Sequence, residues 1–211
     1  MSSSVEPSAD FVAVPGGRVR QVLRIGSVAT WTGFSFLLWG VGALLFFPLA
    51  RVRQRWRLSS FRRWAGGSCR LLGMRRTIEG TPPLDAPFIL VSNHLSYVDI
   101  ILLASVVPGV FVAKREVRAW PMWGLFASAM RTIYVDRERR RDALRVASVI
   151  DSALGQGEGV ILFPEGTSTD GSRVQPLKPA LLAVAANSAH PVHYARLSYR
   201  TPEGVPPAAQ T

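Results

Sequence analysis

The chain has 211 residues, enough for one domain of about 150 residues and an appendage. Its 25 Lys and Arg against 14 Asp and Glu give a formal net charge of +11, and every basic residue except Lys114 and Lys178 is an arginine. No zinc-finger, helix-turn-helix or aromatic-interleaved basic pattern is present, so we expect no nucleic-acid partner and interpret the charge as attraction to membrane phosphates. The single cysteine, Cys69, excludes an internal disulfide.

The N-terminal part of the chain contains a long apolar run. Residues 1–24 are predicted to form a disordered tail, because they open with a stretch rich in Ser, Pro, Gly and Ala that has no apolar period. Residues 25–50 carry no charge, and this run exceeds the roughly 20 residues that an apolar helix needs to cross a bilayer. We therefore expect a membrane helix over 25–50. A secretory leader is disfavoured, because the run starts late and lacks a small-residue cleavage pattern.

A basic segment, residues 51–74, follows the apolar run and is interpreted as a juxtamembrane or interfacial region. Arginines are more frequent after the run than before it, which predicts that the rest of the chain lies on the cytoplasmic side. The alternative is a hairpin that enters only one leaflet. Gly40, Gly42 and Pro48 would allow the break, and residues 58–72 would form a second, interfacial helix.

Residues 75–211 are expected to form the catalytic domain. Short strands and helices alternate from residue 75 to 198, which indicates an α/β fold with a mixed central sheet flanked by helices. The strands are expected over 88–91, 110–113, 132–135, 160–163 and 192–198. The helices are expected over 98–107, 120–130, 139–154 and 178–187.

One histidine and one carboxylate lie five residues apart after the first strand, at His94 and Asp99. On a single helix they would point about 140° apart, so the motif must straddle a turn if the two side chains are to meet. A histidine whose ring is oriented by a carboxylate is a suitable general base. No Gly-x-Ser-x-Gly motif supplies a nucleophile, so the base would activate a hydroxyl of the substrate.

Other interpretations of these polar residues remain open. Ser96 and Asp99 also fit the capping-box pattern at a helix start. The loop 164–171 follows a strand and is either a ligand-binding loop or a plain turn. His190 and His193 have a metal-like spacing, but they straddle a proline and lack a third ligand at a recognisable spacing, so no metal site is expected.

Three stretches together resemble the first three motifs of the glycerolipid acyltransferases, and their order and spacing also match. They are NHLSYVD at 93–99, TIYVDR at 132–137 and FPEGT at 163–167. The resemblance runs from about residue 73 to 199 and is greatest to the bacterial 1-acyl-sn-glycerol-3-phosphate acyltransferase family. It implies a glycerol-3-phosphate acyltransferase-like fold on the cytoplasmic face of a bacterial inner membrane.

The resemblance also implies an activity and roles for particular residues. An acyl group would pass from acyl-CoA or acyl carrier protein, with no other cofactor, to the free hydroxyl of 1-acyl-glycerol-3-phosphate, giving phosphatidic acid for phospholipid biosynthesis. His94 resembles the base and Asp99 its orienting partner. The positions that resemble substrate-binding residues are Arg137, Glu165, Gly166, Thr167 and Lys178. A guanidinium suits a phosphate, whereas Glu165 suits a hydroxyl or an arginine.

Two features depart from the family pattern. Ser168 stands where many members have an arginine, so a lyso-ornithine lipid, which has no phosphate, is an alternative acceptor. The chain ends at Thr211, where many relatives continue, and a C-terminally abbreviated domain is one interpretation of this. A non-catalytic lipid-binding membrane protein of the same fold and a hydrolase are the remaining alternatives.

Overall fold

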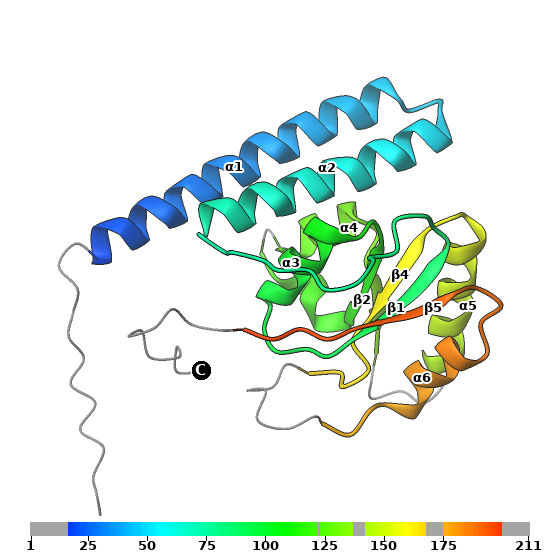
Figure 1. Ribbon diagram of the computed structural model, residues 1–211. Helices are drawn as coiled ribbons and strands as arrows, with labels where there is room; N and C mark the ends of the chain where they lie inside the picture. Colours follow the sequence, from blue (N-terminus) through cyan, green and yellow to red (C-terminus); the bar gives the residue numbers. More distant parts are fainter. Residues whose placement is uncertain (1–16, 122, 137–141, 168–174, 200–211) are drawn as a thin grey trace, which may run out of the picture.

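The computed structural model describes residues 17–121, 123–136, 142–167 and 175–199. Two long helices, α1 (Gly17–Leu45) and α2 (Ala50–Leu71), precede an α/β domain and lie antiparallel along one side of it (Figure 1). The elements of that domain are, in chain order, β1 (Phe88–Ser92), α3 (Val98–Val106), β2 (Val110–Lys114), the 3₁₀ helix η1 (Arg115–Ala119), α4 (Trp123–Ala129), β3 (Ile133–Val135), α5 (Asp142–Gly155), β4 (Gly159–Leu162), α6 (Pro179–Ala186) and β5 (Val192–Ala195).

The five strands form one sheet in the order β3-β2-β4-β1-β5, and all four neighbouring pairs are parallel. The α/β fold is confirmed, but the expected mixed sheet is wrong for the strands that the structure describes. Helices lie between successive strands along the chain, so each crossover returns the chain in the same direction. The central strands β1 and β4 are short apolar runs, which is typical of strands buried on both faces, whereas the edge strand β5 is partly exposed.

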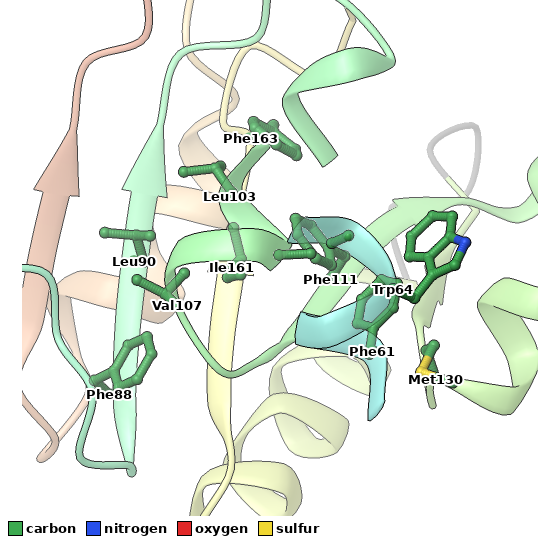
Figure 2. Packing of buried hydrophobic residues seen from close by; sticks show 12 residues of the cluster. Phe61, Trp64, Phe88, Leu90, Leu103, Val107, Phe111, Met130, Ile161 and Phe163 are labelled. Carbon is green, nitrogen blue, oxygen red and sulfur yellow. The ribbon is translucent and has the colours of Figure 1, made fainter. Parts of the chain in front are cut away.

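Side chains alternate between two buried clusters, one on each face of the sheet. Along β1, Phe88 and Leu90 enter the cluster that packs against α2 and α3, and Ile89 enters the cluster that packs against α5 and α6. Figure 2 shows the first cluster, in which Phe61 and Trp64 of α2 lie with residues of the sheet and of α3. The core of the domain therefore extends upstream of residue 75 into α2.

The helix boundaries at the N-terminus differ from those expected from hydropathy. The helix begins at Gly17, eight residues before the apolar run, because arginine is a good helix former and does not interrupt it. It ends at Leu45, because proline disfavours helical geometry in the residue before it and Pro48 lies in the turn that follows. The arginine-rich segment then forms α2, which buries Phe61, Trp64 and Ala65 on one stripe at helical spacing.

Tryptophans and glycines hold α1 and α2 together. The Trp56 indole lies over Gly42, where an added Cβ would come within 2.1 Å of the ring, and the Trp31 indole lies in the same way over Gly67. The Trp31 Nε1–H donates to the Trp64 carbonyl at 2.9 Å, and the Trp56 Nε1–H donates to the Trp39 carbonyl at 3.1 Å. These close contacts make the two helices one hairpin.

A buried carboxylate joins α2 to the sheet. Glu158, in the turn between α5 and β4, is 1% exposed and accepts from Arg57 at 2.6 Å and from Arg131 at 2.8 Å. Arg57 also donates to the carbonyl of Met130 at 3.0 Å. Three separate segments are therefore tied to one another by a single charged group.

We expect Glu158→Ala to lower the free energy of unfolding by about 3–5 kcal/mol, because it leaves Arg57 buried without its counter-charge. Denaturant unfolding in detergent, followed by circular dichroism, measures the change. Glu79→Ala, in an exposed loop, is the control and should cost less than about 0.5 kcal/mol. The double variant Arg57→Met with Glu158→Leu should recover most of the loss, and a Glu158→Ala variant as stable as the control would contradict this assignment.

Candidate active site

The His94 and Glu165 turns lie at the same edge of the sheet. β1 and β4 are parallel neighbours in the register Phe88↔Gly159 to Val91↔Leu162, so the turns that follow them emerge side by side. Ligand sites of parallel α/β sheets occur at this carboxyl edge. The strand-to-turn crossing expected for His94 is therefore observed, with α3 starting four residues later at Val98.

The carboxylate of Asp99 is fully buried and accepts hydrogen bonds at both oxygens. Oδ2 lies 2.8 Å from His94 Nδ1 and accepts the backbone N–H groups of Leu95 at 2.6 Å and Ser96 at 2.9 Å. Oδ1 accepts the Tyr199 hydroxyl. The structure thus brings His94 and Asp99 together as the turn geometry requires.

The capping interpretation holds in part. Asp99 accepts from the N–H of Ser96, as the acid of a capping box does. The Ser96 hydroxyl accepts from the N–H of Val98 at 3.3 Å, not from that of Asp99. Asp99 therefore serves the helix start and the histidine with the same oxygen.

Electrostatics favour an ionised Asp99. Burial acts to raise the pKa of this carboxyl, but the hydrogen bonds from His94, Tyr199, Ser96 and Leu95 hold it below its ordinary value. An ionised acceptor at Oδ2 requires the proton of His94 to sit on Nδ1. Nε2 is then the ring atom that can accept a proton from a bound molecule.

Aromatic contacts fix the plane of the His94 ring. The ring stacks on Phe163, with centroids 4.2 Å apart and an angle of 19° between the planes. Tyr97 meets it edge-on at 6.5 Å and itself contacts Trp120, which follows η1. The His94 side chain is 11% exposed, so it is largely enclosed but not sealed.

Glu165 links the two turns through backbone groups. It is 3% exposed, accepts the N–H of His94 at 3.1 Å with Oε1, and accepts the N–H of Gln175 at 3.1 Å with Oε2. Gly166, at φ +77°, follows in a conformation that favours glycine, and its N–H donates to the Phe163 carbonyl at 3.1 Å. In this structure Glu165 positions the backbone of His94. Its expected contact with a hydroxyl or an arginine stays a prediction.

The other expected substrate residues are placed less closely. Thr167 is exposed directly after Gly166. Lys178 adjoins the same turn through its backbone, whose N–H donates to the Pro164 carbonyl at 2.7 Å, and its side chain is exposed. Arg137 and Ser168 lie outside the described residues.

Three residues that shape the site were missed from the sequence. Phe163 and Asn93 belong to the motifs that suggested the site. Nothing in their spacing indicates that Phe163 stacks on the His94 ring or that Asn93 hydrogen-bonds to the backbone of Leu197. Tyr199 had no signal at all, because it lies 100 residues from Asp99. Contacts of that separation are decided by strand order.

A protein-family model described as Acyltransferase matches residues 75–197. The chain belongs to the acyltransferase family. The match spans every element from β1 to β5 and includes both turns of the site.

Comparison with curated proteins finds similar acyltransferases with two kinds of name. A "Lyso-ornithine lipid O-acyltransferase" of Rhizobium meliloti is 40% identical over 57% of this chain and 41% of its own length. One of the same name from Rhodobacter capsulatus is 29% identical over 96% of this chain and 74% of its own length. A "1-acyl-sn-glycerol-3-phosphate acyltransferase" of Neisseria gonorrhoeae is 30% identical over 57% of this chain and 48% of its own.

A solved structure has the same fold. It is the 1-acyl-sn-glycerophosphate (LPA) acyltransferase PlsC from Thermotoga maritima, which superposes with a TM-score of 0.62 at 24% identity. The match covers 82% of this chain and 73% of that one.

For several of the similar curated proteins, this chain spans only about half of their length or less.

Proposed function

We propose that the chain transfers an acyl group from a thioester donor, acyl-CoA or acyl carrier protein, to the free hydroxyl of a lysolipid. The observation that carries this proposal is the His94–Asp99 pair, because it leaves Nε2 of an oriented imidazole as a proton acceptor. The described contacts of the His94 ring include no serine or cysteine, which supports direct transfer without an acyl-enzyme.

In the proposed reaction, His94 Nε2 takes the proton of the lysolipid hydroxyl as its oxygen attacks the thioester carbonyl. The imidazolium that forms is stabilised by Asp99, which stays ionised. The tetrahedral intermediate then expels the thiolate. The thiolate takes the proton back from His94, so the products are the ester and a free thiol, and the histidine is returned to its starting state.

For the acceptor, we propose a lyso-ornithine lipid, with 1-acyl-glycerol-3-phosphate as the second candidate. One relative named for the first acceptor is 44% identical over 55% of this chain, and one named for the second is 34% identical over 58% of it. Ser168, in place of the arginine of many members, also supports an acceptor without a phosphate. Arg137, which suits a phosphate, supports the second candidate.

We also propose that the hairpin of α1 and α2 enters one leaflet of the membrane. α1 includes a stretch, Val19–Leu45, that is long and apolar enough to cross a bilayer. Its C-terminal half, however, packs along the arginine-rich start of α2 through the contact of Gly42 with Trp56. Burying that half at the bilayer centre would take arginines with it, at about 2.5–3.5 kcal/mol each on insertion scales. A hairpin with apolar α1 residues among lipid tails and α2 arginines among head groups avoids this cost.

The proposed location is the cytoplasmic face of a bacterial inner membrane. Acyl-CoA and acyl carrier protein are found on that side, and the arginines that follow α1 favour it.

We expect His94→Ala to lower kcat/KM for acyl transfer by about 10²–10⁴-fold, because it removes the general base. Asp99→Asn should also be severe, because it loses control of the tautomer. Thiol release and lipid mass spectrometry measure turnover, with circular dichroism as the check on folding. His190→Ala is the matched histidine control. Wild-type turnover by a folded His94→Ala variant would contradict the mechanism, and wild-type protein that binds lysolipids without turnover would favour the non-catalytic alternative.

The acceptor is decided by comparing both lysolipids on wild type and on Arg137→Ala. With a lyso-ornithine lipid as acceptor, the substitution should leave kcat/KM nearly unchanged. If 1-acyl-glycerol-3-phosphate is the acceptor, loss of a charge-assisted contact worth about 1.5–3 kcal/mol should lower kcat/KM by roughly 10–150-fold. Arg137→Lys would then recover only part of the loss, since it restores the charge but not the planar fork.

Membrane topology is tested with a tag at each end of the full chain in sealed membrane vesicles. A one-leaflet hairpin leaves both tags accessible to protease on the same side, whereas a spanning α1 protects one of them. Leu37→Glu, on the exposed face of α1, should weaken vesicle binding by about tenfold or more. Leu144→Glu is the control, because Leu144 is an exposed residue of α5, and it should have little effect on vesicle binding. Opposite accessibility of the two tags would overturn the hairpin.

A further inference from the structure

The segment that follows β5 runs across the His94–Asp99 pair. β5 pairs with β1 as far as Ser92↔Ala195. Leu197 lies two residues beyond Ala195, and the Asn93 carboxamide binds both of its backbone groups. It accepts the Leu197 N–H at 2.7 Å and donates to the Leu197 carbonyl at 3.0 Å. Asn93 thereby fixes the path of the chain beyond the end of the sheet.

This path delivers Tyr199 to Asp99. Tyr199 as a whole residue is 45% exposed, but its hydroxyl donates to the buried Asp99 Oδ1. The other oxygen, Oδ2, holds the His94 ring and two backbone N–H groups. Among the described residues, Tyr199 is therefore the donor to the carboxylate oxygen that does not hold the histidine.

We infer that Tyr199 is a positioning residue for the His94–Asp99 pair, a role that rests on the proposed use of this pair as the catalytic base. Its hydroxyl holds the carboxylate against rotation about Cβ–Cγ, so that Oδ2 stays aimed at Nδ1. It also draws charge from the carboxylate, which limits how strongly the imidazolium is held and so eases return of the proton to the leaving thiolate.

Both effects have measurable consequences. Without the hydroxyl, the buried Oδ1 loses its donor and the carboxylate becomes more basic, so the pair should bind its proton at a higher pH. The acid limb of the pH dependence of kcat belongs to the pair as a whole and should move upward with it. Among the described residues, three other titratable groups face this site. Tyr97 meets the His94 ring edge-on, Glu165 binds the His94 backbone, and Cys69 is buried on α2 near Tyr199.

The test is Tyr199→Phe, which removes one oxygen atom and keeps the ring. Tyr194→Phe is the matched control, because it makes the same change on a side chain that is 92% exposed. The first readout is ¹⁵N-histidine NMR of the full chain in detergent, which follows protonation of the pair whether or not the substrate is known. The second is the pH dependence of kcat and KM with the acceptor that the wild type uses.

In Tyr199→Phe we expect the NMR titration and the acid limb of kcat to move upward together by about one pH unit, as expected for the loss of one hydrogen bond to a carboxylate. We expect kcat to fall about tenfold while KM stays within about twofold, because Tyr199 acts through Asp99 and not on the substrate. In an Asp99→Asn background, the same substitution should leave the titration where it was.

Other outcomes overturn the inference. If the NMR titration of Tyr199→Phe matches that of the Tyr194→Phe control, the inference is wrong, whether or not kcat falls. A merely structural role would lower activity without moving the titration. If Tyr199→Phe does not fold, Asn93→Ala, which releases the segment at Leu197, must produce the same upward shift, and an unchanged titration there rejects the role. A wild type that turns over neither lysolipid would count against the proposed function only, since the NMR titration still tests Tyr199.

Discussion

The Asp99 carboxylate is the constraint on which the site depends. A buried charge is costly unless hydrogen bonds compensate it, and the donors to Asp99 come from three places in the structure: the His94 ring, the turn at Leu95 and Ser96, and Tyr199 beyond the last strand. Satisfying this one group fixes the start of α3 and the tautomer of the histidine, and it binds Tyr199 in the segment that Asn93 holds at Leu197. The carboxylate that orients the proposed base therefore also joins the turn after β1 to the segment after β5.

The parallel sheet explains why the turn that contains Glu165 lies beside the turn that contains His94. Because β1 and β4 are parallel neighbours, the turns after them leave the sheet together, and Glu165 can accept the backbone N–H of His94. Phe163, the last residue before the second turn, supplies the face on which the histidine ring stacks. Had the two strands been antiparallel, their carboxyl ends would lie at opposite edges and the two motifs could not form one site.

The α1–α2 hairpin and the α/β domain share α2. On one side its residues interlock with α1 through the contacts of Gly42 with Trp56 and Gly67 with Trp31. On the other side Phe61 and Trp64 enter the core (Figure 2), and Arg57 is bound to Glu158. α2 therefore belongs to both parts, and residues 72–87 connect it to β1. A membrane-bound hairpin would therefore hold the site at a set height and orientation relative to the lipid surface.

The sequence by itself determined the local features of this protein. The five strands predicted from the sequence lie close to their observed positions, the spacing of His94 and Asp99 required the turn in which they meet, and the three motifs identified the family. Only the tertiary structure decided that the sheet is parallel throughout its described strands, that the arginine-rich segment carries a core stripe, and that Tyr199 reaches Asp99. The physical reason is range. Residues within one turn are placed by backbone geometry, which spacing encodes, whereas residues 100 positions apart meet only through the order in which strands and helices pack, and a single sequence records which faces are apolar but not which partner covers them.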